Sequence, residues 1–168
     1  MKKYPFLSLL LLIPMALSLL SPVSAAGKED LNLFCSYAVL LDANHGEILY
    51  DMGANQRAYP ASITKVMTAL LVMEAIEYGQ LSPDTVVTVN QSAVENIPIE
   101  YVVGSFKPGE TSSIEELRYC MLLESDCDAS NILAEAVDTT VEDFVAHMNR
   151  KAGELGCHGT HFTTTYGL

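Results

Sequence analysis

The sequence predicts an α+β fold, because β-strand and helix signals occupy separate parts of the chain. An apolar stretch at 37–42, the turn-forming residues 43–46 and a second β-rich stretch at 47–50 together are typical of a β-hairpin. Helical patterns then dominate from residue 62 to about residue 156. The final segment, 160–164, is again rich in β-forming residues and favours a strand.

The first residues have the order of a secretory signal peptide. Lys2 and Lys3 are followed by an apolar run at 6–20 and by small residues at 21–26, where a signal peptidase would cut. An uncleaved membrane anchor is the alternative, but the run is shorter than the roughly 20 residues that a spanning helix needs. We therefore expect a signal peptide over 1–26 and an exported domain over 27–168.

The charge balance excludes one class of partner. The chain has 21 acidic and 9 basic residues, with a formal net charge of −12. A protein that binds nucleic acid needs basic side chains to neutralise phosphates, so no nucleic-acid partner is expected. The length fits one domain with a substantial core.

The longest predicted helix begins at Ser62 and is expected to stop at Gly79, since glycine commonly follows a helix C-terminus. Apolar residues recur at helical spacing along it, and they predict one buried stripe. The residues of that stripe are Ile63, Val66, Met67, Leu70 and Leu71.

Further elements follow from capping and turn signals. Ser113 and Glu116 form a capping box, and Thr140 is a good N-cap for a later helix. A short strand is expected at 85–89. Three more helices are predicted, with approximate limits 113–124, 128–137 and 140–156.

Ser62 and Lys65 are the central chemical feature. Side chains three residues apart on a helix share a face. A serine hydroxyl becomes a good nucleophile when a neighbouring base takes its proton, and a neutral lysine amine can be that base. The N–H groups at a helix start can also stabilise an oxyanion. The other interpretation is a serine N-cap with a surface lysine.

A second serine, Ser125, lies at the break between two predicted helices. Its hydroxyl could point into a cleft and relay a proton between Lys65 and a leaving amine. On composition alone, an N-cap for the helix beginning at Asp128 is the favoured interpretation.

The remaining cysteines and histidines give weak signals. Cys35, Cys120, Cys127 and Cys157 match no small disulfide framework. Cys157, His158 and His161 lie close in sequence, but such spacing is weak support for zinc, and no metal or cofactor is expected. His45 is interpreted as a solvated turn residue.

Three stretches resemble one enzyme family. The segment 59–69, with Ser62 and Lys65, resembles the active-site segment of the low-molecular-mass penicillin-binding proteins, the D-alanyl-D-alanine carboxypeptidases. The segment 117–135 is similar to that family's second motif region, and Leu155-Gly156, Thr160-His161-Phe162 and Tyr166-Gly167-Leu168 also match its pattern. The likeness extends from about Tyr37 to the last residue.

The resemblance implies a helical cluster against an antiparallel sheet and a known chemistry. Ser62 would be acylated by a peptidoglycan stem peptide ending in D-Ala-D-Ala, Lys65 would be its base, and Ser125 would assist the leaving group. β-Lactams would acylate the same serine as inhibitors. No obligatory protein partner is implied, and the expected place of action is the cell envelope or the exterior.

The sequence departs from that family pattern in two ways. Cys127 stands where the second motif usually has asparagine, and its thiol is a weaker hydrogen-bonding group at a position that would bind substrate. The third motif, Lys-Thr-Gly, does not occur, nor do the family's C-terminal β-rich domain and membrane-anchoring helix. We interpret the chain as the N-terminal part of such an enzyme, truncated before the later strands.

Other functions remain open at this point. A β-lactamase or D,D-endopeptidase would share Ser62 and Lys65. An inactive secreted fragment or a peptidoglycan-binding module is the non-catalytic alternative, and an exported metal-binding module is a third.

Overall fold

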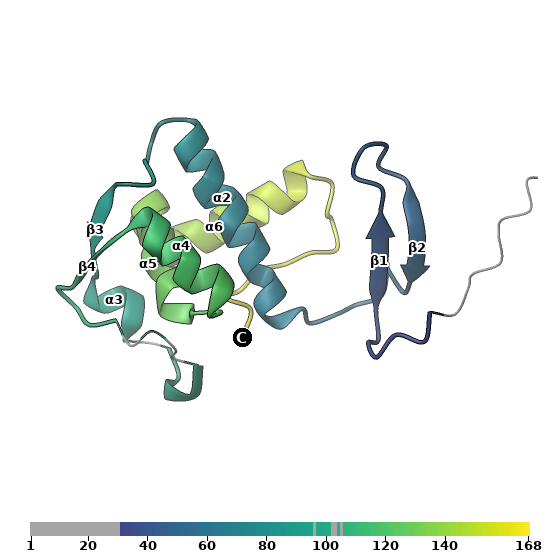
Figure 1. Cartoon of the computed structure of the whole chain (residues 1–168), viewed down its shortest axis with the longest axis horizontal. Helices are drawn as coiled ribbons and strands as arrows, with labels where there is room; N and C mark the ends of the chain where they lie inside the picture. Colours follow the sequence, from purple (N-terminus) through teal and green to yellow (C-terminus); the bar gives the residue numbers. More distant parts are fainter. Residues whose placement is uncertain (1–30, 96, 102–103, 105) are drawn as a thin grey trace, which may run out of the picture. The chain divides into compact units, whose positions relative to one another are not determined.

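The computed structural model of the chain describes residues 31–168 except 96, 102–103 and 105, so the expected signal peptide lies outside the described residues. The described residues belong to two compact units, divided between Arg57 and Ala58. The first unit contains a β-hairpin, and the second contains a helical cluster with a small sheet (Figure 1). The second unit carries all the residues that the sequence predicts to be catalytic.

The first unit confirms the predicted hairpin. Strand β1 (Ala38–Leu41) pairs antiparallel with β2 (Ile48–Met52), with Leu40 opposite Tyr50. Asp42 holds the turn, because its Oδ2 lies 2.5 Å from His45 Nδ1. This hydrogen bond is the main reason why the pKa of Asp42 is lowered. The His45 side chain is 72% exposed, which confirms its interpretation as a turn residue.

The predicted long helix is present. It starts with a 3₁₀ turn, η1 (Ala61–Thr64), and continues as α2 (Lys65–Glu77). Gly79 follows the helix with φ +75°, a left-handed conformation that glycine adopts without strain. Ser62 therefore lies in the tight first turn, one turn before the α-helix proper.

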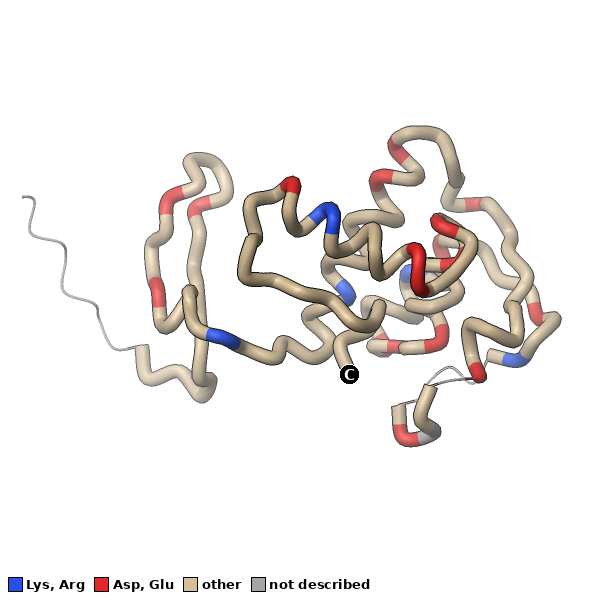
Figure 2. Tube along the Cα trace, turned by 180° about the vertical axis from the view of Figure 1, so that it is seen from behind, with Lys and Arg blue, Asp and Glu red and all other residues tan. Residues whose placement is uncertain are grey.

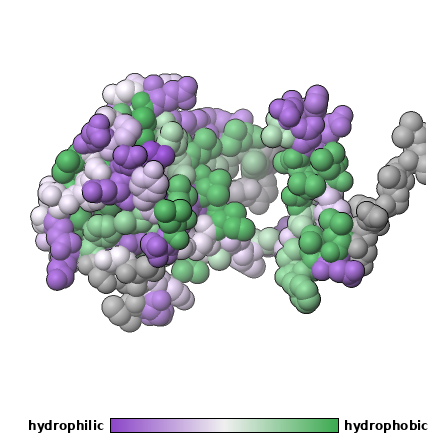
Figure 3. Space-filling model, viewed as in Figure 1, coloured by the Kyte–Doolittle hydropathy of each residue, from purple (hydrophilic) through white to green (hydrophobic). Residues whose placement is uncertain are grey.

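The predicted buried stripe of this helix is wrong, because a different face of the helix is buried. Ile63 and Val66 are 70% and 64% exposed, and Leu70 is exposed as well, whereas Leu71 is buried. Figure 3 shows the resulting hydrophobic surface over α2. Because α2 has apolar side chains all around its axis, sequence periodicity could not identify the face that packs on the helical core. The residues of α2 on that face are Lys65, Thr68, Leu71, Val72 and Ala75.

A small sheet lies beside the helical cluster. Strand β3 (Val86–Thr88) confirms the predicted strand, and it pairs antiparallel with β4 (Thr111–Ser113), which the sequence did not indicate. A short helix, α3 (Gln91–Val94), and a 3₁₀ turn, η2 (Ile99–Tyr101), lie between these strands in the chain. Ser113 thus ends a strand and caps the next helix.

Local capping explains where the later helices begin. Ser113 Oγ accepts a hydrogen bond from Glu116 N at 3.2 Å, and Glu116 Oε2 accepts one from Ser113 N at 2.9 Å. This confirms the predicted capping box. The backbone N–H and the hydroxyl of Ser113 both donate to the Glu116 carboxylate, and these two hydrogen bonds lower the pKa of Glu116. Thr140 caps the last helix as expected. The three helices are α4 (Ile114–Leu123), α5 (Cys127–Asp138) and α6 (Val141–Glu154).

Helix α5 is the centre of the second unit. All eight residues at 127–134 are buried, and α5 contacts α2, α3, α4 and α6. Its neighbours contribute Leu71, Leu117, Phe144 and Met148 to the core, each at most 1% exposed. Burial of a large apolar side chain contributes roughly 1.5–3 kcal/mol, so this cluster fixes the position of α5 and of the loop that precedes it.

The predicted strand at 160–164 is wrong. The segment forms bends, and the side-chain amide of Asn149 satisfies the backbone of Phe162. Asn149 Nδ2 donates to Phe162 O at 2.9 Å, and Phe162 N donates to Asn149 Oδ1 at 2.8 Å. A side chain of α6 therefore takes the place of a neighbouring strand.

Acidic side chains outnumber basic ones along the described chain. Figure 2 shows acidic positions in both units and fewer basic ones. Among the described residues, every helix falls short of the length and apolar character that a membrane span requires.

Candidate active site

The second unit brings Ser62 and Lys65 together as their spacing predicts. Lys65 Nζ donates to Ser62 Oγ at 3.2 Å. Lys65 is only 3% exposed, although it is a lysine, whereas Ser62 is exposed. A buried amine beside an accessible hydroxyl is one arrangement that can activate a serine as a nucleophile.

Ser125 joins this pair from the loop between α4 and α5. Its Oγ donates to Ser62 Oγ at 2.8 Å and accepts from Lys65 Nζ at 3.3 Å. The backbone of Ser125 has φ +63°, a left-handed conformation that costs a non-glycine residue of order 1–3 kcal/mol and is often found at functional sites. Three polar atoms, two hydroxyls and one amine, therefore lie within hydrogen-bonding distance of one another.

The N-cap interpretation of Ser125 is wrong, because the next residue performs that role. Asp126 Oδ1 accepts hydrogen bonds from Asp128 N at 2.8 Å and Ala129 N at 3.2 Å. This leaves the Ser125 hydroxyl available to Ser62 and Lys65. The sequence contained the signal, since aspartate is as good an N-cap as serine.

Two further groups surround the lysine amine. Cys127 Sγ lies 3.8 Å from Lys65 Nζ, and the backbone carbonyl of Tyr166 accepts from the same nitrogen at 3.4 Å. Burial raises the pKa of the Cys127 thiol despite the opposing effect of Lys65, so this sulfur is neutral at neutral pH and a poor nucleophile. The Tyr166 carbonyl could not be predicted from the sequence, because a backbone group leaves no residue-type signal.

Burial also affects a carboxyl group behind the site. Asp128 is 1% exposed, and burial together with the neighbouring charge of Asp126 raises its pKa. The backbone N–H of Phe106 favours the charged form of Asp128 and partly offsets this shift. These two carboxyl groups belong to the start of α5 and do not contact the Ser62 hydroxyl.

Other residues singled out from the sequence lie outside this cluster. Cys157, His158 and His161 are exposed, and no group of three metal-ligating side chains comes together among the described residues. All four cysteines are unpaired thiols.

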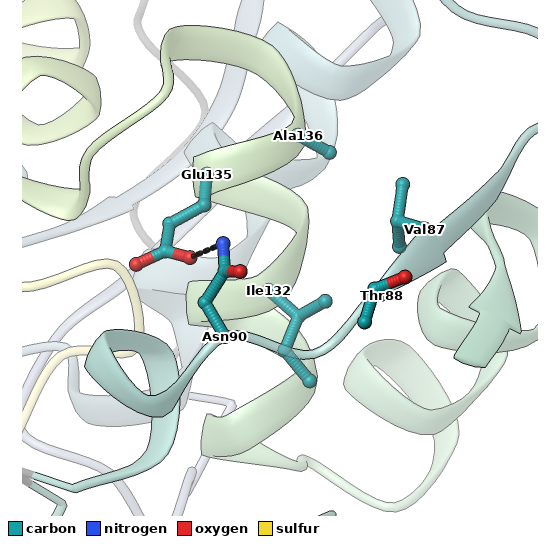
Figure 4. A pocket seen from close by; sticks show the side chains of 6 residues that line it. All are labelled: Val87, Thr88, Asn90, Ile132, Glu135 and Ala136. Atoms are coloured by element: carbon teal, nitrogen blue, oxygen red, sulfur yellow. Dashed lines mark hydrogen bonds between the residues drawn. The ribbon is translucent and has the colours of Figure 1, made fainter. Parts of the chain in front are cut away.

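A separate hollow lies between β3 and α5, and Figure 4 shows its lining side chains. Asn90 Nδ2 donates to Glu135 Oε2 at 2.8 Å, and Ser92 Oγ donates to Glu135 Oε1 at 2.6 Å. Both carboxylate oxygens of Glu135 are thus already bonded within the protein. These contacts tie the start of α3 to α5.

Comparison with known proteins decides the family. The model of the family described as D-alanyl-D-alanine carboxypeptidase matches residues 24–168. The chain belongs to this family. It is therefore a relative of serine-type peptidases of peptidoglycan metabolism, and the resemblance drawn from 59–69 and 117–135 is confirmed.

Curated relatives show how much of the family's length is present. D-alanyl-D-alanine carboxypeptidase DacF of Bacillus subtilis is 36% identical over 131 residues, which cover 78% of this chain and 33% of the relative. DacD of Escherichia coli is also 36% identical, over 77% of this chain and 34% of the relative. The chain spans about a third of the length of these carboxypeptidases.

Solved structures confirm the predicted α+β, penicillin-binding-protein-like fold. The D-alanyl-D-alanine carboxypeptidase DacD of Francisella tularensis superposes with a TM-score of 0.76 at 30% identity, over 84% of this chain and 33% of that structure. Penicillin-binding protein D2 of Listeria monocytogenes, in its ampicillin-bound form, gives 0.69 at 30% identity, over 83% and 55% respectively.

Proposed function

We propose that this chain carries the acylating centre of an exported serine D-Ala-D-Ala carboxypeptidase. The observation that carries the proposal is the Ser62, Lys65 and Ser125 cluster, with its two hydroxyls 2.8 Å apart and one buried amine next to both. Family membership supplies the substrate class, a peptidoglycan stem peptide ending in D-Ala-D-Ala.

In the proposed reaction, Ser62 is the nucleophile, because it is the more exposed of the two serines. Its Oγ bonds to the carbonyl carbon of the penultimate D-alanine while Lys65 takes the hydroxyl proton. Ser125 passes a proton to the nitrogen of the terminal D-alanine as the C–N bond breaks. Water then adds to the acyl carbon and releases Ser62.

Export and inhibitor binding complete the proposal. The basic, apolar and small segments within 1–26 direct the chain across the membrane, where its substrate is located. β-Lactams act as substrate mimics at Ser62, in line with the ampicillin- and cefotaxime-bound forms of the Listeria relative.

The test is covalent labelling of the mature chain with ampicillin, followed by intact-mass measurement and peptide mapping. We expect one adduct, on the peptide that contains Ser62. A folded sample without an adduct, with folding checked by circular dichroism, would contradict the proposal. Rapid loss of the adduct with release of hydrolysed ampicillin would instead indicate a β-lactamase.

Replacement of the Cys127 thiol is predicted to make acylation of Ser62 faster. Cys127→Asn is expected to raise the acylation rate roughly 2- to 10-fold, because an amide oxygen is a stronger acceptor for Lys65 Nζ than a thiol and one hydrogen bond contributes about 0.5–1.5 kcal/mol. The rate of adduct formation measures the effect, and Cys157→Asn, the same change at an exposed cysteine, is the control. An unchanged or lower rate would show that the thiol suits the site.

A further inference from the structure

We propose that Thr165 is a positioning residue for Lys65, and that it acts through a buried chain of hydrogen bonds linking three helices. The proposal rests on the function assigned above to Lys65. It concerns a segment, 164–167, in which no residue belongs to a helix or strand.

The starting point is the carbonyl of Tyr166, which accepts a hydrogen bond from Lys65 Nζ at 3.4 Å. Lys65 and Tyr166 are 3% and 8% exposed, so water has little access to this contact. The direction of a carbonyl group depends on the backbone angles of its own segment. Without a helix or strand to set those angles, other contacts must hold the segment in place.

Thr165 provides those contacts through its backbone carbonyl and its side-chain hydroxyl. Its carbonyl oxygen accepts from Thr68 Oγ1 at 2.6 Å, and its Oγ1 donates to Asn131 Oδ1 at 2.6 Å. Asn131 Nδ2 in turn donates to the carbonyl of Ala93 at 2.9 Å. Thr165 and Thr68 are both 0% exposed, and Asn131 is 6% exposed. Helices α2, α3 and α5 are thereby tied to one threonine.

The geometry couples this chain to the lysine. Thr68 is three residues after Lys65, so both side chains project from the same face of α2. Helix α2 therefore contacts two successive carbonyls of the segment, that of Thr165 through Thr68 and that of Tyr166 through Lys65. Rotation of either carbonyl would leave buried polar groups unpaired, which is strongly unfavourable.

These hydrogen bonds fix the position of the Lys65 amine. A base must lie close to its proton donor, and a displacement of about 1 Å can reduce a rate by roughly 100-fold. The hydroxyls of Ser62 and Ser125 alone leave Lys65 Nζ free to move toward either one. The Tyr166 carbonyl, held by Thr165, restricts that movement from the buried side.

The kinetic test uses Thr165→Val, which keeps the shape of the side chain and removes its hydroxyl. We expect the acylation rate constant to fall roughly 10- to 100-fold, while the concentration of ampicillin that gives half the maximal rate stays unchanged. Thr165→Ser, which restores the donor, should recover most of the rate. Thr163→Val makes the same change at an exposed threonine two residues away and should behave as the wild type.

A second readout does not depend on activity. In protein labelled with carbon-13 at lysine Cε, the Lys65 resonance is assigned by its disappearance in Lys65→Arg. Thr165→Val is expected to shift or broaden that resonance and to leave those of Lys107 and Lys151 in place. Circular dichroism and a urea unfolding curve show that the variant is folded.

The outcomes separate this inference from the proposed function. Absence of an adduct in the wild type would contradict the function, and the Lys65 resonance would still test the positioning. A folded Thr165→Val variant whose Lys65 resonance is unchanged would overturn the inference, whatever the acylation result. A rate loss that Thr165→Ser does not recover would overturn it as well.

Discussion

Replacement of Ser62 by alanine is expected to abolish the covalent ampicillin adduct, with a residual rate below about one thousandth of the wild type. The change removes the oxygen that forms the acyl bond, and the neutral Cys127 thiol nearby is a poor substitute. Intact mass after a long incubation is the measurement.

The matched control is Ser125→Ala, because the two hydroxyls lie 2.8 Å apart and both contact Lys65 Nζ. If Ser125 only transfers protons, its loss should slow adduct formation by about 100-fold and leave the adduct on Ser62. An adduct mapped to Ser125 in the wild type or in Ser62→Ala would exchange the two proposed roles.

Replacement of Gly167 by alanine is expected to destabilise the second unit by about 3 kcal/mol or more. Gly167 has φ +88°, and a Cβ there would lie 2.0 Å from the carbonyl oxygen of Ala61 and 2.5 Å from Thr64 Oγ1. Relief of that clash requires η1 to move, and η1 carries Ser62. The free energy of unfolding in urea and the rate of ampicillin acylation should therefore fall together.

Gly159→Ala is the control for this change. A Cβ at Gly159 would meet nothing within 4 Å, and the residue has no left-handed backbone, so its stability should stay within about 0.5 kcal/mol of the wild type. If Gly167→Ala were as stable as the wild type, η1 could move away from Gly167 at no cost in free energy. That result would contradict the close packing of Gly167 against η1.

Local chemistry accounts for most of the elements that could be predicted. The capping box of Ser113 and Glu116, the Thr140 cap and the turn at Asp42 each involve residues at most four positions apart. Such signals involve only a short stretch of sequence, so they can be recognised without knowledge of the rest of the fold. The pairing of Ser62 with Lys65 belongs to the same class, because helix geometry alone puts them on one face.

Long-range contacts account for the failures. The 160–164 segment has strand-forming residues, but Asn149 of α6 occupies the backbone groups of Phe162. The buried face of α2 cannot be predicted from its own sequence, because nearly every side of that helix is apolar. Which face is buried depends on where α4, α5 and α6 pack. β-Strand and burial preferences are weak compared with such contacts.

The residue types of the site are present in the sequence, and its assembly is a property of the folded chain. Ser62 and Lys65 are neighbours by helix geometry, but Ser125 reaches them across 60 or more positions because Asp126, and not Ser125, caps α5. The Tyr166 carbonyl joins from about 100 positions away through the bonds of Thr165. Periodicity reports which face a side chain shares with its near neighbours, whereas contacts between distant segments follow from burial of a common core.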